Sequence, residues 1–361
     1  NGPQVWEQNH SRTVLVPEIT KRGLLLEVGG HAFSTWLPPG RYSKDHPEYY
    51  AVKEDGTRSS TEFVCLSHPD VPRLMADNIN IWLDENTEVA AVDLWHNDMS
   101  DYCHCAACTP RPADGAQSQA AYTRTYIRFT NQVASRVARR HPRVLVNFLA
   151  YDQTLDCPAG ATPLADNVLV GLCLFPRPTQ RTMRPLETSQ QLLDSRLRRQ
   201  IPKWRNLAKH FYIYEYYTFS VREKVWPRAE IWSMVAMMSD DLHFFRRIGV
   251  EGISSDQWSG DWAPLNMYAL GKLTWDPLRK PRDIVAEFCL RYYGDASGPM
   301  TAYWELLEEG LQESWRTEGP IDWRERERRV QIRKALSLTA SDAVKSRIRA
   351  TAALHLLAIG E

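Results

Sequence analysis

Short apolar runs alternate along this chain with longer segments in which apolar residues recur every three or four positions. The short runs predict buried strands, and the periodic segments predict amphipathic helices. Strands are expected at residues 23–31, 88–95, 144–151, 167–175, 211–217 and 249–256. Helices are expected at 69–86, 118–141, 187–209, 228–247, 284–293, 298–313 and 323–359.

The alternation of strand and helix, with strands that are apolar throughout, predicts a parallel sheet covered by helices. A Rossmann sheet is disfavoured because no Gly-x-Gly-x-x-Gly motif follows any of the strands. Polar and aromatic residues gather at the C-terminal ends of the strands, where α/β barrels place their active sites. We therefore expect a (β/α)8 TIM-type barrel over residues 1–280, with up to two strands weak or missing, and a C-terminal helical region over residues 281–361.

The charge balance limits the partners that this chain can have. The 361 residues include 44 basic and 44 acidic side chains, which argues against nucleic acid or an anionic membrane as a main partner. No run of about 18 apolar residues is present, so no transmembrane helix is expected. The chain starts at Asn1 without a recognisable signal peptide. We expect a processed or truncated soluble chain, and secretion or a periplasmic location stays open.

The pair Asn97-Asp98 ends the strand expected at 88–95, directly after Trp95 and His96. Such pairs commonly form a turn or a helix N-cap. A catalytic interpretation makes Asp98 a general acid and lets Asn97 bind a substrate hydroxyl. Trp95 would remove water from Asp98 and so favour the protonated carboxyl that a proton donor needs at neutral pH.

Glu215 is the second candidate catalytic carboxylate. It is the only charged residue between Phe211 and Phe219, on a strand expected to be buried on both faces. A carboxylate there is costly unless it is paired, for example with an arginine beneath the barrel, or functional. Together with Asp98 it supplies the minimum for glycoside hydrolysis, in which one carboxyl group donates a proton and the other attacks the anomeric carbon or activates water.

Four cysteines form a candidate metal site: Cys65, Cys103, Cys105 and Cys108. The last three form a Cys-x-Cys-x-x-Cys motif after Asn97-Asp98, and in a barrel the loop that carries the first would meet them. Four thiolates suit a structural zinc ion, which prefers a closed tetrahedral sulfur site. Disulfides or free thiols are alternatives, and His96 or His104 could replace one thiolate. No organic cofactor is expected.

Aromatic and polar side chains at the other strand ends are candidates for carbohydrate binding. The chain contains 13 Trp, 15 Tyr and 10 Phe, and aromatic faces stack on the apolar C–H groups of sugar rings. His31, Asn97 and Tyr151 are expected to contact hydroxyl groups, although a lone histidine is more often structural. Three aromatic residues and one acid would complete the sugar subsites: Trp95, Tyr217, Trp258 and Asp256.

In combination, these motifs resemble DUF family 4838, a barrel family related to glycoside hydrolases, over most of residues 23–305. The segments that carry the resemblance are Gly29-Gly30-His31, His46-Pro47-Glu48, Cys65 to Pro69, Asn97-Asp98 with the three following cysteines, Ala150-Tyr151, Tyr214-Glu215-Tyr216 and Trp275-Asp276-Pro277. The resemblance implies a barrel related to those of glycoside hydrolases.

A more distant resemblance is to family 42 β-galactosidases. In that family an Asn-Glu pair ends the fourth barrel strand, and a Cys-x-Cys-x-x-Cys segment with one earlier cysteine binds structural zinc. The resemblance implies that Asn97-Asp98 occupies the Asn-Glu position, that Cys65 completes the zinc ligands and that Glu215 is the nucleophile. Asp98 departs from the family because it is one methylene shorter than Glu. If the strand at 88–95 is the fourth, the barrel is incomplete at its N-terminus.

Family 20 hexosaminidases offer a third resemblance, because they end the fourth strand with an Asp-Glu pair and use the acetamido group of the substrate as nucleophile. That resemblance implies that Asn97-Asp98 orients and protonates the substrate and that Glu215 only binds it.

The main hypothesis is a retaining glycoside hydrolase that acts on an oligo- or polysaccharide. Asp98 would be the acid/base and Glu215 the nucleophile, and retention requires the two carboxyl groups to lie about 5–5.5 Å apart. The alternatives are a non-catalytic carbohydrate-binding barrel, a substrate-assisted N-acetylhexosaminidase and a zinc hydrolase. The sequence leaves the sugar, its linkage and the oligomeric state open.

Overall fold

The computed structural model describes residues 11–59, 63–98, 102–109, 115–174, 191–217, 233–255, 264–317 and 324–357. The chain divides into two compact units. The first unit comprises Asn1–Cys173 and Arg196–Ile213, and the second comprises Leu174–Ser195 and Tyr214–Glu361. None of the described helices is long and apolar enough to cross a membrane.

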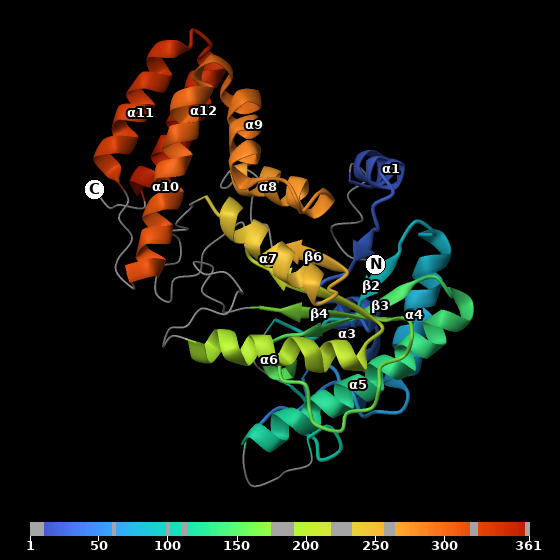
Figure 1. The fold of residues 1–361 in the computed structure, drawn as a ribbon. Helices are drawn as coiled ribbons and strands as arrows, with labels where there is room; N and C mark the ends of the chain where they lie inside the picture. Colours follow the sequence, from blue (N-terminus) through green and yellow to red (C-terminus); the bar gives the residue numbers. More distant parts are fainter. Residues whose placement is uncertain are drawn as a thin grey trace. The chain divides into compact units, whose positions relative to one another are not determined.

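A single sheet of six strands is found among the described residues, with the strands in chain order across it (Figure 1). The strands are β1 (Glu27–Val28), β2 (Ala91–Asp93), β3 (Leu145–Ala150), β4 (Val168–Cys173), β5 (His210–Glu215) and β6 (Gly252–Ser255). β1 to β4 pair in parallel, and each of these four lies within a segment whose apolar run predicted a strand.

The expectation of a (β/α)8 barrel is wrong. The described strands form a half-barrel of six and not a closed barrel of eight, although the α/β class is correct. Small barrels close when about eight tilted strands surround a filled interior. Polar residues at the C-terminal strand ends did not separate the two architectures, because open parallel sheets bind their ligands at that same edge.

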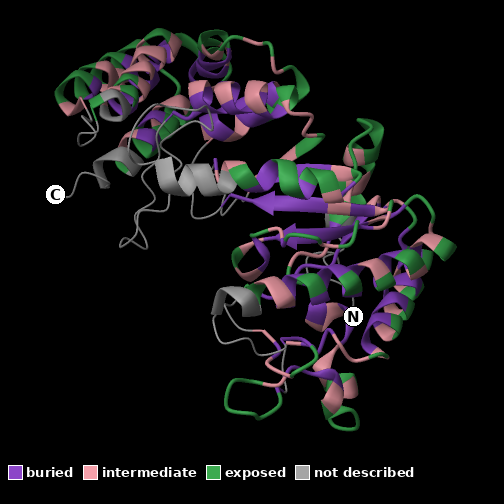
Figure 2. Cartoon of the chain, turned by 60° about the horizontal axis from the view of Figure 1, so that its bottom comes forward, coloured by how far each residue is buried: buried purple, intermediate pink, exposed green. Residues whose placement is uncertain are grey.

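An aromatic core covers the helix-facing side of the sheet in the first unit. The described helical elements up to β6 are η1 (Ser11–Leu15), α1 (Val16–Lys21), α2 (Phe33–Trp36), α3 (Pro39–Tyr42), η2 (Pro47–Tyr49), α4 (Val71–Glu85), α5 (Gly115–Arg140), η3 (Asp152–Thr154), α6 (Gln191–Leu207) and α7 (Val235–Arg247). Phe148 on β3 packs against Tyr126 on α5 and Trp204 on α6, with ring centroids 4.3 and 5.1 Å apart. All three side chains are buried, as is most of β3. Figure 2 shows strands of the sheet coloured as buried.

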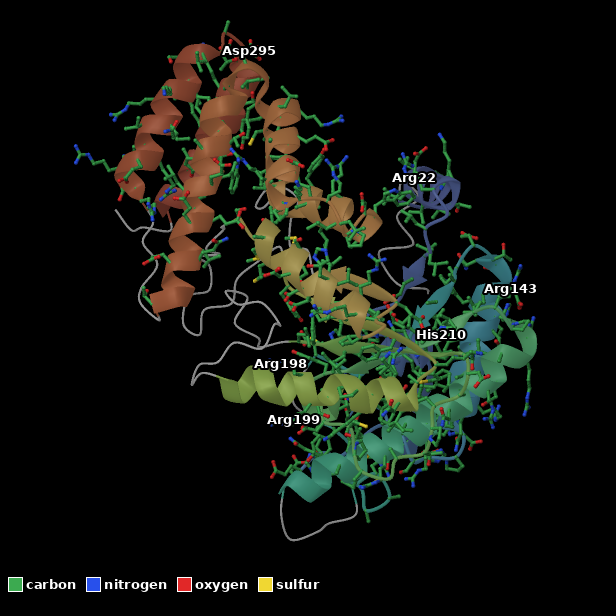
Figure 3. The ribbon with its side chains drawn as sticks, in the orientation of Figure 1. Arg22, Arg143, Arg198, Arg199, His210 and Asp295 are labelled. Atoms are coloured by element: carbon green, nitrogen blue, oxygen red, sulfur yellow. The ribbon has the colours of Figure 1, made fainter. Side chains whose placement is uncertain are left out.

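Because β1 to β4 are parallel, these strands share one edge where they start and one where they end. Arg143 precedes β3 and marks the starting edge (Figure 3). The residues that directly follow β1, β2 and β3 lie at the ending edge, which is where the sequence predicts the site.

The second unit contains the C-terminal helices, which follow β6. They are α8 (Pro264–Trp275), α9 (Pro281–Tyr293), η4 (Gly294–Ala296), α10 (Ser297–Thr317), α11 (Glu325–Leu338) and α12 (Asp342–Leu357). Their buried faces form a core that includes Phe288, Trp304 and Leu307. The sequence did not predict α8. The single helix expected at 323–359 is divided in two, because Thr339 after α11 has extended backbone angles (φ −114°, ψ 133°).

Candidate functional site

Three of the predicted site residues meet at the ending edge of the sheet in the first unit. His31 follows β1, Asp98 follows β2 and Tyr151 follows β3. The Tyr151 hydroxyl donates a hydrogen bond to Oδ1 of Asp98 at 3.1 Å, and Nε2 of His31 lies 3.8 Å from the same oxygen. The Asp98 side chain is 66% exposed. The parallel sheet therefore presents one accessible carboxylate beside a phenol and an imidazole.

Aromatic rings stand beside this carboxylate. The His31 ring lies 5.7 Å from Trp95 and 6.5 Å from Tyr151, measured between ring centroids. Trp95 is buried, but Asp98 is exposed, so the expected desolvation of Asp98 by Trp95 is not observed. Burial and the nearby Asp98 charge raise the pKa of Tyr151. Tyr151 is thus a neutral donor to Asp98 at physiological pH.

His96 lies behind these residues and ties two loops together. Its Nδ1 lies 3.0 Å from the Asn97 carbonyl, and its Nε2 lies 3.2 Å from both the Tyr151 carbonyl and Oγ1 of Thr154. Burial lowers the pKa of His96 to about 4, so the ring is neutral at physiological pH. His96 is therefore a structural residue that holds the end of β2 against the end of β3.

Asn97 and Tyr217, two of the predicted sugar contacts, are buried. Asn97 is only 4% exposed, beside the His96 ring. Tyr217 is fully buried, and its hydroxyl donates a hydrogen bond to Oδ2 of Asp241 at 3.0 Å. That hydroxyl is thus bound within the second unit. The predicted contacts Asp256 and Trp258 lie outside the described residues.

Glu215, the predicted nucleophile, is the last residue of β5 and belongs to the second unit. Its side chain is fully buried, and Oε2 accepts a hydrogen bond from the Tyr216 backbone N–H at 3.0 Å. Asp98 belongs to the first unit. The structure brings Asp98 together with His31 and Tyr151, and the pairing of Asp98 with Glu215 stays a prediction from the sequence.

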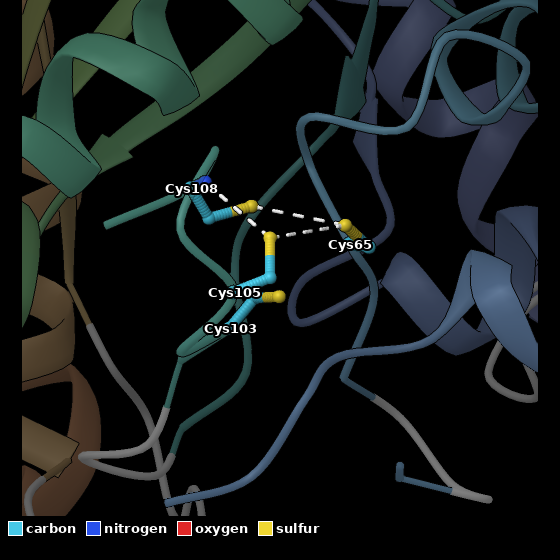
Figure 4. A group of neighbouring side chains, drawn as sticks. All are labelled: Cys65, Cys103, Cys105 and Cys108. Carbon is cyan, nitrogen blue, oxygen red and sulfur yellow. Dashed lines mark hydrogen bonds between the residues drawn. The ribbon is translucent and has the colours of Figure 1, made fainter. Parts of the chain in front are cut away.

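The four predicted thiol ligands converge in the first unit (Figure 4). Their sulfur atoms all lie within 4.8 Å of one another. Sγ of Cys65 lies 3.8 Å from Sγ of both Cys105 and Cys108. These separations are too long for disulfides, whose sulfur atoms lie about 2.05 Å apart. The cysteines are free thiols that form a candidate metal site, as the sequence predicted.

Backbone N–H groups point at two of these sulfur atoms. The Val52 N–H donates to Sγ of Cys103 and the Cys108 N–H donates to Sγ of Cys105, both at 3.4 Å. Hydrogen bonds with Cys103 and Cys108 lower the pKa of the Cys65 thiol, and hydrogen bonds with Cys103 and Cys65 raise the pKa of the Cys108 thiol. Backbone N–H donors such as those of Val52 and Cys108 stabilise the thiolate form of a cysteine, which is the form that binds a metal.

The two histidines that were considered as replacement ligands are not part of this group. The His104 ring stacks on Tyr102, with centroids 4.8 Å apart, and the His96 ring contacts the loop after β3. All four ligand positions of the described cluster are therefore thiols.

A second polar group in the first unit was missed. Asp93 ends β2 and is 4% exposed, Asn147 lies beside it on β3, and Glu27 and Tyr212 complete the group. The sequence carried a signal for Asp93, because a single charge in the apolar run 89–95 is the same pattern that singled out Glu215.

The fold and the two sites define an α/β protein with a half-barrel sheet, an accessible carboxylate at its ending edge and a four-thiol cluster. Residues 4–305 match the family described as Domain of unknown function (DUF4838), and the chain belongs to this family. The resemblance to DUF family 4838 is thereby confirmed. No curated protein matches the chain. The family description names no activity, so the relationship with glycoside hydrolases stays a prediction.

Proposed function

We propose that this protein is a glycoside hydrolase and that Asp98 is its acid/base. The observation that carries the proposal is the exposed Asp98 carboxylate at the end of β2, which accepts a hydrogen bond from Tyr151 and lies 3.8 Å from His31. A glycosidase needs a carboxyl group that reaches the glycosidic oxygen. The Tyr151 hydroxyl and the His31 ring suit recognition of sugar hydroxyl groups, and nearby aromatic rings suit sugar C–H faces.

The proposed nucleophile is Glu215, on the argument that a buried carboxylate at a strand end is costly unless it has a task. In the first step a Glu215 carboxylate oxygen bonds to the anomeric carbon while the bond from that carbon to the glycosidic oxygen breaks, and Asp98 gives its proton to the departing glycosidic oxygen. In the second step Asp98 takes a proton from water, and the resulting hydroxide releases the sugar from Glu215. Configuration at the anomeric carbon is retained.

The first experiment is a screen of aryl glycosides and oligosaccharides, followed by the variants D98N and E215Q. Loss of a general acid or nucleophile is expected to lower kcat by about 100-fold or more while binding persists. Asp152→Asn is the matched control, because Asp152 is an exposed acid next to Tyr151 and Asn tolerates its positive φ of 46°. Its kcat should stay within about twofold of the parent, since changes at exposed sites are usually small.

The outcomes of this experiment separate the candidate functions. Sugar binding without turnover, unchanged in E215Q, would mean a non-catalytic carbohydrate-binding protein. Turnover restricted to N-acetylated substrates, and retained in E215Q, would mean the substrate-assisted mechanism. Rescue of a Glu215→Ala variant by azide would identify the nucleophile directly, if the glycosyl azide formed has an anomeric configuration inverted relative to the substrate.

We also propose that the four thiolates of Cys65, Cys103, Cys105 and Cys108 bind one structural Zn²⁺ ion. A tetrahedral ion with Zn–S bonds of about 2.3 Å places its sulfur ligands about 3.8 Å apart, and the two Sγ–Sγ distances from Cys65 have this value. Four protein ligands close the coordination sphere, so the ion would hold loops and would not activate water. This argues against the zinc hydrolase.

Metal analysis of the purified protein tests the zinc proposal. We expect one zinc per chain and an X-ray absorption spectrum of four sulfur ligands at about 2.3 Å. Cys65→Ser should lose most of the zinc, whereas Cys157→Ser, a half-buried cysteine outside the cluster, should keep it. A purified protein that contains no zinc, and whose intact mass shows that the four cysteines have formed disulfides, would contradict the proposal.

A further inference from the structure

The register of the sheet places Asp93 opposite a glycine turn. Val28 pairs with Val92, so Gly29 falls opposite Asp93, and Asp93 itself pairs with Asn147. In-register residues of parallel neighbours point to the same face, as do residues two apart on one strand. Glu27, Asp93 and Asn147 therefore share one face of the sheet.

Asn147 joins these side chains. Its Nδ2 lies 2.7 Å from Oε1 of Glu27, 2.8 Å from Oδ1 of Asp93 and 2.8 Å from the Tyr212 hydroxyl. Tyr212 reaches Asn147 from β5 across β4, where Gly171 leaves room. A Cβ atom on Gly171 would lie only 2.6 Å from the Tyr212 ring. One carboxyl oxygen of Asp93 is thereby fixed.

The other Asp93 oxygen holds the turn after β1. Oδ2 accepts a hydrogen bond from the Gly30 N–H at 2.5 Å. Gly29 (φ 141°) and Gly30 (φ 77°) adopt angles that favour glycine, and a Cβ atom on Gly29 would lie 2.7 Å from Cβ of Asp93. The Asp93 carbonyl also accepts a hydrogen bond from Nε1 of Trp36 at 2.8 Å. Asp93 is thus bonded to both ends of the segment that carries His31.

His31 is the next residue after this turn. Its Nδ1 makes a short hydrogen bond with the His96 carbonyl oxygen, and its Nε2 lies 3.8 Å from Asp98. We propose that Asp93 is the positioning residue of the site, because its bond to Gly30 fixes the turn that holds His31 against His96 and beside Asp98. The catalytic consequence rests on the proposed function, whereas the placement of His31 does not.

The electrostatics favour a neutral Asp93. Burial, the charge of Glu27 on β1 and a hydrogen bond with Glu27 raise the pKa of Asp93 well above its usual range. Among the described residues, Tyr212 on β5 and Tyr126 on α5 also interact electrostatically with Asp93, and burial raises the pKa of both hydroxyls. A carboxylic acid can share its proton with Glu27 and still accept from Gly30, so an uncharged Asn should serve in its place.

The test measures hydrogen exchange of the Gly30 amide and the NMR signal of the His31 imidazole. In protein labelled with ¹⁵N-glycine, the Gly30 amide should exchange with solvent at least about 100-fold more slowly than an unstructured amide, although it lies outside the strands. In protein labelled with ¹³C-histidine, D93N and E27Q should keep the His31 signal, because both retain an acceptor for Gly30. Asp93→Ala should move this signal and speed Gly30 exchange at least about tenfold.

Free exchange of Gly30 in the parent protein would overturn the proposal, and this result does not depend on whether Asp93→Ala folds. An unchanged His31 signal in folded Asp93→Ala would also overturn it. If a glycoside substrate is found, Asp93→Ala should lower kcat by about 100-fold with KM nearly unchanged, and D93N should restore most of the rate. If no glycoside is hydrolysed, the proposed function fails while the two spectroscopic signals still decide the role of Asp93.

Discussion

The Tyr151 hydroxyl donates a hydrogen bond to the Asp98 carboxylate across the ends of two neighbouring strands. These residues are 53 positions apart in the sequence, and the pairing of β2 with β3 brings them together. Tyr151 is a neutral donor because burial raises its pKa. The contact therefore orients Asp98 without adding charge to the site.

Tyr151→Phe should weaken catalysis more than stability. A hydrogen bond to a charged group contributes about 1.5–3 kcal/mol, so kcat on the best glycoside should fall about 10- to 100-fold. Tyr49→Phe is the control, because the Tyr49 ring stacks on His46 and does not contact Asp98. Steady-state kinetics with melting temperatures decide the matter, and equal losses in both variants would count against a role for the Tyr151 hydroxyl.

Removal of metal should destabilise the first unit. Since metal binding free energy adds to folding free energy, a chelator should lower the melting temperature of the parent by at least about 5 °C. Cys65→Ser should melt early and not respond to the chelator, and Cys157→Ser should respond like the parent. A parent protein that melts at the same temperature with and without chelator would show that no metal stabilises this loop.

Gly171→Ala should destabilise the sheet. The added methyl group would lie 2.6 Å from the Tyr212 ring, and overpacking of this kind costs about 1–3 kcal/mol. Gly271→Ala is the matched control, because its methyl group meets open space on α8 and should stabilise the helix by about 0.5–1 kcal/mol. Urea unfolding measures both changes, and the prediction requires them to have opposite signs.

Stability should depend on pH through Glu308 in the second unit. Its carboxylate accepts hydrogen bonds from the Ala236 N–H at 3.0 Å and the Ser233 hydroxyl at 3.1 Å. Burial raises its pKa from 4.5 to about 7. The folded protein therefore binds the proton of the Glu308 carboxyl group more tightly than the unfolded chain does. The contribution of this protonation to the free energy of unfolding is complete below pH 4.5 and is lost as the pH rises to about 7.

The Glu308→Gln variant isolates this effect. Between the unfolded pKa of 4.5 and the folded pKa of about 7, the lost stability amounts to at most about 3 kcal/mol. The Gln side chain cannot ionise, but its oxygen still accepts the hydrogen bond from the Ala236 N–H. The difference in unfolding free energy between parent and variant should therefore change across this pH range. Glu309→Gln, at an exposed position on the same helix, should keep the pH dependence of the parent. Parallel profiles for parent and Glu308→Gln would contradict the prediction.

Much of the secondary structure could be predicted because it depends on local periodicity. The apolar run 144–151 predicted a strand and contains β3. The three- and four-residue spacing of Tyr122, Tyr126 and Phe129 predicted a helix, and these residues lie in α5. Closure of the sheet could not be predicted, because it depends on how many strands pair and not on any one of them. The α/β class was right because it follows from these local patterns, and the complete eight-stranded barrel was wrong.

The candidate site was predictable to the extent that strand ends meet. Asp98, His31 and Tyr151 follow parallel strands, and the four cysteines are brought together by neighbouring loops. The exposure of Asp98 was not predictable, since the distance between a side chain and the Trp95 ring is set by the turn between them. The role of Asp93 was hidden for a similar reason, because its partners lie on the neighbouring strands β1 and β3 and in the turn after β1.

The sequence by itself determined which residues were candidates for the two sites, because a carboxylate is unusual in an apolar run and thiols are unusual at such close spacing. Only the tertiary structure decided which of them meet. The register of β1 with β2 sets Gly29 opposite Asp93, and Gly171 on β4 opens a path for Tyr212. Such contacts join residues far apart in the chain, and their free energy is gained only when strand pairing has fixed the backbone.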